Sequence, residues 1–195
     1  MPAVVNHEER RQQIARIAAD LISGVGLDAM TMREIAAAAG FSTTIVTHYF
    51  ASKRELMLYT YRASVAHAQA RVEAVIARDA CDLQGSIEAL LPFDESSLKD
   101  WKVFLAFWQI AQVDPDFAAE QRAQAANADS ILRRVLRARV LAGRGLNEAD
   151  VDATSRRLLV FTVGLAVQAV FDTLGWSSQA QRAFLKSELR LLAGA

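Results

Sequence analysis

Apolar residues recur at three- and four-residue spacing along most of the chain. Near the N-terminus, Ile14, Ile17 and Leu21 fall on one stripe, with charged residues gathered at the start of the same segment. Ala, Leu, Arg, Glu and Gln dominate the rest, and no run of β-branched and aromatic residues alternates with polar ones between turn signals. This pattern predicts an all-α protein.

Two short helices are predicted after the first one. Thr31 with Glu34 three residues later forms a capping-box pattern, which opens a helix that Gly40 ends. Ser42 is an N-cap residue for a third helix that runs to about Tyr49. Two short helices joined by a tight turn that contains glycine are typical of a helix-turn-helix unit.

A second capping-box pattern, Ser52 with Glu55, opens a long fourth helix. Beyond Cys81, leucine-rich segments alternate with turn signals such as Asp114-Pro115, where proline stands at a first helical position. About nine helices are predicted in total, over residues 6–23, 31–39, 42–49, 53–78, 83–91, 97–112, 115–142, 147–174 and 178–193.

Charge and cysteine content narrow the class of protein. The 195 residues carry 22 basic and 22 acidic side chains, so any binding to nucleic acid must come from a local site rather than from bulk charge. Cys81 is the single cysteine, and no leader peptide is recognisable. The apolar stretch 158–171 is interrupted by Gly164 and Gln168 and is too short to span a membrane. We expect a cytoplasmic protein without a membrane segment.

The third predicted helix has two different sides. Val46 and Phe50 suit the buried side of a three-helix unit. The outward side carries hydroxyls and one imidazole and no carboxylate, which suits the donors, acceptors and methyl groups of bases in the major groove. These outward residues are Thr43, Thr44, Thr47 and His48.

The stretch from Thr31 to Leu56 resembles the DNA-binding part of the TetR family of bacterial transcription regulators. The shared pattern is Gly-hydrophobic-Ser at 40–42, a third helix that ends in Tyr-Phe, and then Ser-Lys-x-x-Leu. The form Thr-His-Tyr-Phe at 47–50 looks most like the BetI-type branch of betaine-aldehyde-pathway repressors. The aromatic segment 101–108 also resembles the ligand-binding half of that branch.

The resemblance implies a helix-turn-helix DNA-binding domain over residues 1–52 and a helical ligand-binding and dimerisation domain over 53–195. Many family members carry Gly at the position of Thr44 and Tyr at that of Thr47, so the phosphate contact of that Tyr is not carried over. On the family pattern, we expect Arg33, Thr43, Thr44, Thr47 and His48 near bases, and Thr31, the helix start at Ser42, Tyr49 and Lys53 on the phosphate backbone.

An effector pocket is expected in the C-terminal half. Aromatic side chains on one helical face are ordinarily core, but they can also line a cavity. Polar residues inside apolar helices need partners, which a ligand or the protein itself can supply. The candidate lining residues are Trp101, Phe104, Trp108, Gln109, Gln112, Phe161, Thr162 and Gln168.

By resemblance, the protein is a homodimer through the two C-terminal helices and a repressor that a small molecule releases from palindromic double-stranded operator DNA. No cofactor or metal is expected, because His7 and His67 lie far from His48 in the sequence without other ligands at suitable spacing. An all-α enzyme is disfavoured, since no nucleophile arrangement or phosphate loop is present. A helical interaction protein, an activator, and an orphan regulator without a ligand stay open as alternatives.

Overall fold

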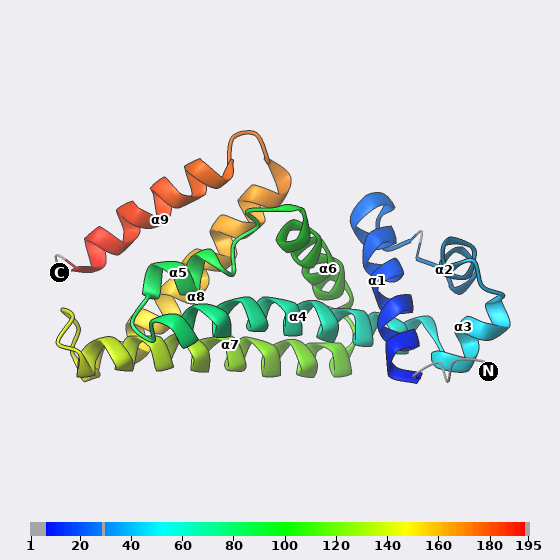
Figure 1. The fold of residues 1–195 in the computed structure, drawn as a ribbon, viewed down its shortest axis with the longest axis horizontal. Helices are drawn as coiled ribbons and strands as arrows, with labels where there is room; N and C mark the ends of the chain where they lie inside the picture. Colours follow the sequence, from blue (N-terminus) through cyan, green and yellow to red (C-terminus); the bar gives the residue numbers. More distant parts are fainter. Residues whose placement is uncertain (1–6, 29, 194–195) are drawn as a thin grey trace. The chain divides into compact units, whose positions relative to one another are not determined.

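The computed structural model describes residues 7–28 and 30–193, which form nine α-helices, one 3₁₀ turn and no strand (Figure 1). This confirms the all-α prediction. The predicted helix start at Asn6 lies outside the described residues. The elements are α1 His7–Val25, α2 Met32–Ala39, α3 Thr43–Tyr49, α4 Lys53–Arg78, α5 Leu83–Glu88, α6 Glu95–Ala111, α7 Pro115–Leu141, η1 Glu148–Asp150, α8 Val151–Phe171 and α9 Ser178–Ala193.

The caps predicted around the helix-turn-helix are present. The Thr31 hydroxyl accepts from the Glu34 N–H, and the Glu34 carboxylate accepts from the Thr31 N–H. Gly40 ends α2 with a φ of 66°, a left-handed conformation that favours glycine. The Ser42 hydroxyl accepts from the Ile45 N–H at 3.3 Å and starts α3. These local bonds fix where both short helices begin and end.

The fourth helix begins with a variant of the predicted box. The Ser52 hydroxyl accepts from the Glu55 N–H at 3.1 Å, as expected, but the Glu55 carboxylate accepts from the N–H of Ala51 at 2.9 Å. The carboxylate therefore reaches one residue further back than a standard capping box requires.

Several helix boundaries differ from the predicted ones; α1, for example, runs on to Val25 rather than ending at 23. Helix α5 ends at Glu88 rather than 91, since the N–H groups of Leu90 and Leu91 close three-residue turns to the carbonyls of Ile87 and Glu88 instead of continuing the α-helical ladder. Helix α6 begins two residues early, since the Asp94 carboxylate accepts from the Ser97 N–H at 2.8 Å and acts as the N-cap. The predicted helix 147–174 is a 3₁₀ turn followed by α8, which ends at Phe171.

The chain divides into two compact units. One comprises the described residues up to Ala66 together with Lys102–Ala118, and the other comprises His67–Trp101 with the described residues from Ala119 onward. Helices α4, α6 and α7 contribute residues to both units. The domain boundary predicted at residue 52 stays a prediction, since each of these units is a group of contacting residues from two separate stretches of the chain and does not define a domain boundary.

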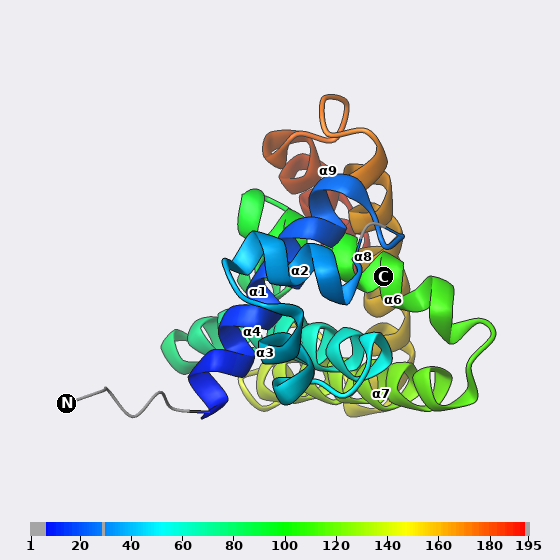
Figure 2. The ribbon, with the colours of Figure 1, turned by 90° about the vertical axis from the view of Figure 1, so that its right-hand side faces the viewer.

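In the first unit, α1, α2 and α3 contact one another around a buried core (Figure 2). Ile14, Ile35 and Val46 are completely buried there, one from each helix. The C-terminal part of α6 belongs to the same core, because the ring of Phe107 stacks on Tyr61 with 3.6 Å between ring centroids. This packing holds the short α2 and α3 in place, which their length alone would not stabilise.

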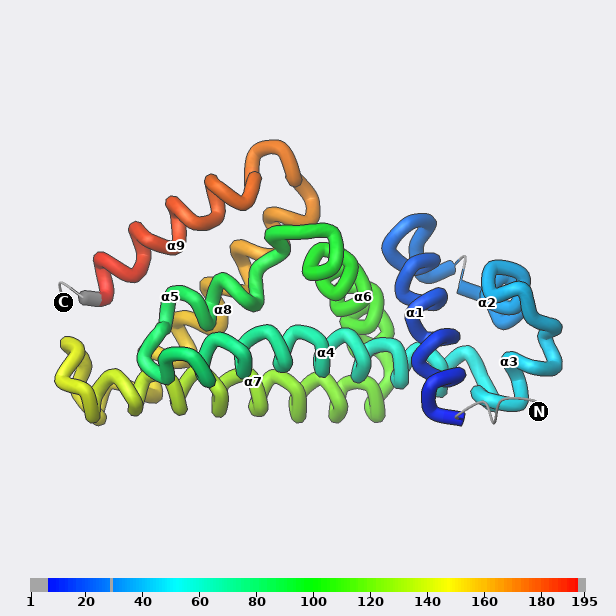
Figure 3. Tube along the Cα trace, in the orientation of Figure 1, coloured from blue at the N-terminus to red at the C-terminus, as the bar shows by residue number. Residues whose placement is uncertain are grey.

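In the second unit, the trace from α8 through the loop 172–177 into α9 is plain in Figure 3. Leu158 of α8 and Leu185 of α9 are completely buried. An ion pair joins the partly buried Arg71 of α4 to the buried Asp100, with 2.8 Å between the guanidinium and the carboxylate. The Arg71 Nε also donates to the carbonyl of Ala89, so both groups have hydrogen-bond partners inside the unit.

Candidate nucleic-acid interface

The outward face of α3 is formed as the sequence predicts. Val46 and Phe50 are completely buried, and this orientation directs the opposite side of the helix to solvent. Helix α3 contains no carboxylate, so its exposed side has no group that would repel phosphate. The side chains on that face, all exposed, are Thr43, Thr44, Thr47 and His48.

The hydroxyls of this face keep their capacity to contact another molecule. Thr47 donates its hydroxyl hydrogen to the carbonyl of Thr44 at 3.1 Å, which leaves its oxygen as an acceptor and its methyl exposed. His48 lies edge-on to the Tyr49 ring, with 5.1 Å between centroids. Tyr49 in turn contacts His7 of α1 at 4.8 Å, so the aromatic side chains of α1 and α3 form one cluster.

Arg10 is a residue of this surface that sequence reasoning missed. Its guanidinium lies 4.8 Å from the centre of the Phe41 ring, and it lines a shallow hollow together with residues of α3 and its N-cap. A signal was present, because His7 and Arg10 are three residues apart and therefore share one side of α1. The hollow is lined by Arg10, Phe41, Ser42, Thr44, Ile45, His48 and Tyr49.

The basic residues at the start of α4 are engaged within the protein. The Lys53 ammonium donates to the carbonyl of Leu27 at 3.0 Å. The Arg54 guanidinium binds Asp114 at 3.1 Å and Asp116 at 2.7 Å. Its hydrogen bond to Asp114 raises the pKa of Arg54 and lowers the pKa of Asp114. A phosphate contact by Lys53 stays a prediction, to which its two other N–H donors are suited.

Two further predicted contacts lie at the start of α2. The Thr31 hydroxyl is used in the capping box, and its hydrogen bond lowers the pKa of the exposed Glu34 carboxyl. The Glu34 carboxylate thus lies next to the Thr31 hydroxyl, which is the group expected to contact phosphate by resemblance to the family. Arg33 is exposed in the first turn of the same helix.

The predicted effector-pocket residues are divided between the two units. Phe104, Trp108, Gln109 and Gln112 belong to the first unit, and Trp101, Phe161, Thr162 and Gln168 to the second. Gln109, Gln112 and Gln168 are exposed in the single chain.

Two of the pocket candidates are buried and hydrogen-bonded. The Trp101 indole N–H donates to the Leu90 carbonyl at 2.7 Å. The Thr162 hydroxyl donates to the Leu158 carbonyl at 2.7 Å. Phe161 packs on Phe184 of α9, with 5.3 Å between ring centroids. The contacts of Trp101 and Thr162 are those of core residues, and the pocket remains a prediction.

No group of three or more His, Cys, Asp or Glu side chains in the described part of the chain could hold a metal ion.

Comparison with known proteins covers nearly the whole chain. Residues 14–60 match the family model of bacterial regulatory proteins of the tetR family, and residues 80–194 match the model of the BetI-type transcriptional repressor C-terminal domain.

Curated relatives include the HTH-type transcriptional regulator PksA of Bacillus subtilis, 27% identical over 88% of this chain and 84% of its own length. The HTH-type regulator BetI of Escherichia coli K12 is 32% identical, over 59% of this chain and 62% of BetI.

Solved structures share the fold at lower identity. A transcriptional regulator from Saccharomonospora viridis in complex with choline superposes with a TM-score of 0.85 and 24% identity, covering 94% of this chain and 96% of that one. A transcriptional regulator from Rhodococcus has a TM-score of 0.82 and 24% identity, with 93% and 95% coverage.

Proposed function

This chain belongs to the TetR family of transcriptional regulators, and we propose that it is a homodimeric repressor that a small-molecule effector releases from a palindromic operator. It is a regulator rather than an enzyme, as both family models describe. The observation that carries the proposal is the exposed face of α3, which presents three hydroxyls and an imidazole and no negative charge.

This face fits direct reading of base edges. A threonine hydroxyl can donate or accept, and its methyl can contact the methyl group of thymine. Helix α3 has only seven residues, so it spans about 10 Å and reaches few base pairs. Specific binding therefore needs two copies of the reading helix, placed on two half-sites by a dimer.

Exposed apolar side chains on α8 and α9 support the dimer. Val160 is 72% exposed and Phe171 is 78% exposed on α8, while Phe184 and Leu191 are exposed on α9. The stretch Glu148–Phe171 is as long and as apolar as a membrane-spanning helix, yet only 33% of its most apolar segment is buried in the single chain. A second copy of the same two helices would cover this apolar surface.

Release of the operator follows from differential binding. An effector that binds one conformation of the dimer more tightly shifts the population toward it, and the operator loses affinity if that conformation misplaces the two α3 helices. The structural neighbour from S. viridis was solved with choline. Choline is therefore the first compound to test for release of the operator.

The proposal is tested by a gel shift with purified protein and DNA from its own upstream region, at a stated salt concentration. We expect a discrete shift that survives competitor DNA. Thr43→Ala and Thr47→Ala should each weaken specific binding by about 1–3 kcal/mol, or roughly 5- to 150-fold, if each threonine contacts a base. Ser130→Ala, which removes an exposed hydroxyl from α7, is the matched control and should bind like the wild type.

A selection from random DNA sequences accompanies the gel shift, so that a distant operator is also found. Operator affinity that is unchanged in both threonine variants would contradict the assignment of α3 as the reading helix. A protein that selects no DNA sequence at all would contradict the proposed repressor.

A further inference from the structure

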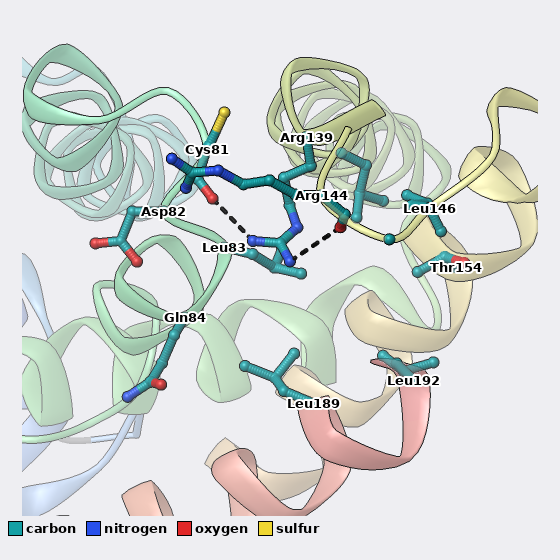
Figure 4. Close-up of a pocket in the computed structure, with 12 residues that line it drawn as sticks. Cys81, Asp82, Leu83, Gln84, Arg139, Arg144, Leu146, Thr154, Leu189 and Leu192 are labelled. Atoms are coloured by element: carbon teal, nitrogen blue, oxygen red, sulfur yellow. Dashed lines mark hydrogen bonds between the residues drawn. The ribbon is translucent and has the colours of Figure 1, made fainter. Parts of the chain in front are cut away.

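A cavity of about 300 Å³ lies in the second compact unit, and none of the predicted effector-pocket residues lines it (Figure 4). It is bounded by the start of α5, the end of α7, the loop 142–147, and one side each of α8 and α9. Its size falls at the small end of ligand pockets. The lining residues are Cys81, Asp82, Leu83, Gln84, Leu136, Arg139, Arg144, Gly145, Leu146, Thr154, Leu189 and Leu192.

The lining has an apolar part and a cationic part. In Figure 4, Leu189 and Leu192 lie on one side and the two arginine side chains on the opposite side, with Leu83 next to the Arg139 guanidinium. Leucine side chains offer apolar surface to an alkyl group, whereas guanidinium groups favour carboxylates. The two parts together fit a molecule that has an alkyl chain and an anionic end.

The two arginines differ in how firmly they are held. The Arg139 guanidinium donates to the carbonyl of Cys81 at 3.1 Å and to that of Arg144 at 3.5 Å, so it is fixed in place. These bonds use two of its five N–H donors. Arg144 lies 3.6 Å from Asp79, beyond hydrogen-bond distance, and both side chains are about half exposed. Arg144 can therefore turn toward a ligand at little cost.

One carboxylate belongs to the lining, and its position limits its effect. Asp82 accepts from the Gly85 N–H at 2.8 Å as the N-cap of α5, so part of its charge is taken up by the backbone. In Figure 4 its carboxylate lies on the far side of the Cys81 backbone from Leu146 and Thr154. The lining thus carries two cations against one anion that is already engaged.

We propose that this cavity binds a small amphipathic carboxylate, with the alkyl chain against the leucines and the carboxylate between Arg139 and Arg144. The proposal concerns the second unit alone and does not depend on operator binding. Residues of five separate segments form the site, which explains why the sequence pattern did not reveal it.

Isothermal titration calorimetry of the full chain with sodium octanoate tests the proposal. We expect saturable binding of one octanoate per chain, with 1-octanol, which has the same chain without the charge, binding at least roughly fivefold more weakly. Arg144→Gln should weaken octanoate binding by a similar factor. Arg144 is the first choice because Arg139 holds two carbonyls of the loop and its removal would disturb the cavity itself.

Arg137→Gln is the matched control, since Arg137 lies two residues before Arg139 on α7, pairs with Glu148 and is outside the lining. It should bind octanoate like the wild type. Leucine methyl NMR locates the ligand: the signals of Leu146, Leu189 and Leu192 should shift, whereas that of the buried Leu158 should not.

Equal affinity for octanoate and octanol would overturn the role of the arginines. Unchanged binding in Arg144→Gln, or shifts confined to leucines outside the lining, would overturn the site. None of these outcomes bears on operator binding, so failure here is distinguishable from failure of the proposed repressor.

Discussion

Thr31 and Glu34 form reciprocal hydrogen bonds at the start of α2, which cap the helix and also involve the charged Glu34 carboxylate. The Thr31 hydroxyl donates to the Glu34 carboxylate at 2.6 Å and accepts from the Glu34 N–H at 3.2 Å. The hydrogen bond lowers the pKa of Glu34 from its ordinary value near 4.5. A lowered pKa in the folded state stabilises the fold above the unfolded pKa, and this contribution is lost as the pH falls through the folded pKa.

Replacing Thr31 by alanine should therefore raise the pKa of Glu34 and make the loss of stability depend on pH. We expect the destabilisation relative to wild type to be larger at pH 7 than at pH 3, because protonation of Glu34 as the pH falls removes the charge that the Thr31 hydrogen bonds stabilise. NMR titration of Glu34 and urea unfolding at the two pH values measure this. Ser42→Ala is the control, because its cap on α3 involves no carboxylate, and its effect should be the same at both pH values. Equal destabilisation by Thr31→Ala at pH 3 and pH 7 would contradict the inference that Thr31 stabilises the charged form of Glu34.

At the scale of elements, Arg11 joins α1 to the end of α3 and the start of α4. Its guanidinium donates to the Tyr49 carbonyl at 2.9 Å and to the Glu55 carboxylate at 3.0 Å. It also lies 4.3 Å from the centre of the buried Phe50 ring. A cation at the last carbonyls of a helix is favourable, so Arg11 supports the end of the reading helix.

Arg11→Leu should lower the free energy of unfolding by about 1–2 kcal/mol, because a carbonyl and a carboxylate lose a charged donor at a partly exposed site. Operator affinity should fall as well, since the end of α3 is released. Urea unfolding and the gel shift measure the two effects. Arg16→Leu, an exposed arginine of the same helix, should change neither. If Arg11→Leu is as stable as Arg16→Leu, the bonds of Arg11 to Tyr49 and Glu55 do not stabilise the end of α3.

The same elements show what the sequence could predict. Thr31, Gly40, Ser42 and Asp114 marked helix boundaries correctly, because a cap depends on bonds within three or four residues. The exposed face of α3 was predictable for the same reason, since helical period places it. The hydrogen-bond partner of Lys53 could not be predicted, because the Leu27 carbonyl is 26 residues away in the sequence and comes close to Lys53 only in the folded chain.

For the whole molecule, the net charge is zero, so DNA binding depends on where the basic and apolar surfaces lie rather than on the total charge. Basic and acidic side chains number 22 each, so attraction to DNA must come from local groups placed twice along the operator. The apolar surface of α8 and α9 is the structural feature that fits such a pairing. In a two-fold symmetric interface every substitution appears twice, so one charge per chain introduces two into the same buried surface.

Val160→Glu should therefore convert the protein toward monomers. An unpaired charge buried in an interface costs about 3–5 kcal/mol, which raises the dimer dissociation constant by roughly a hundredfold or more. Light scattering coupled to size exclusion, at several protein concentrations, measures the change, and binding to the full palindrome should weaken with it. Val113→Glu is the matched control: Val113 is 85% exposed but lies between α6 and α7, so the same new charge there should leave the dimer intact. A dimer that survives Val160→Glu as well as Val113→Glu would have to form through a surface other than the face of α8, and the two reading helices would then be spaced by a different geometry.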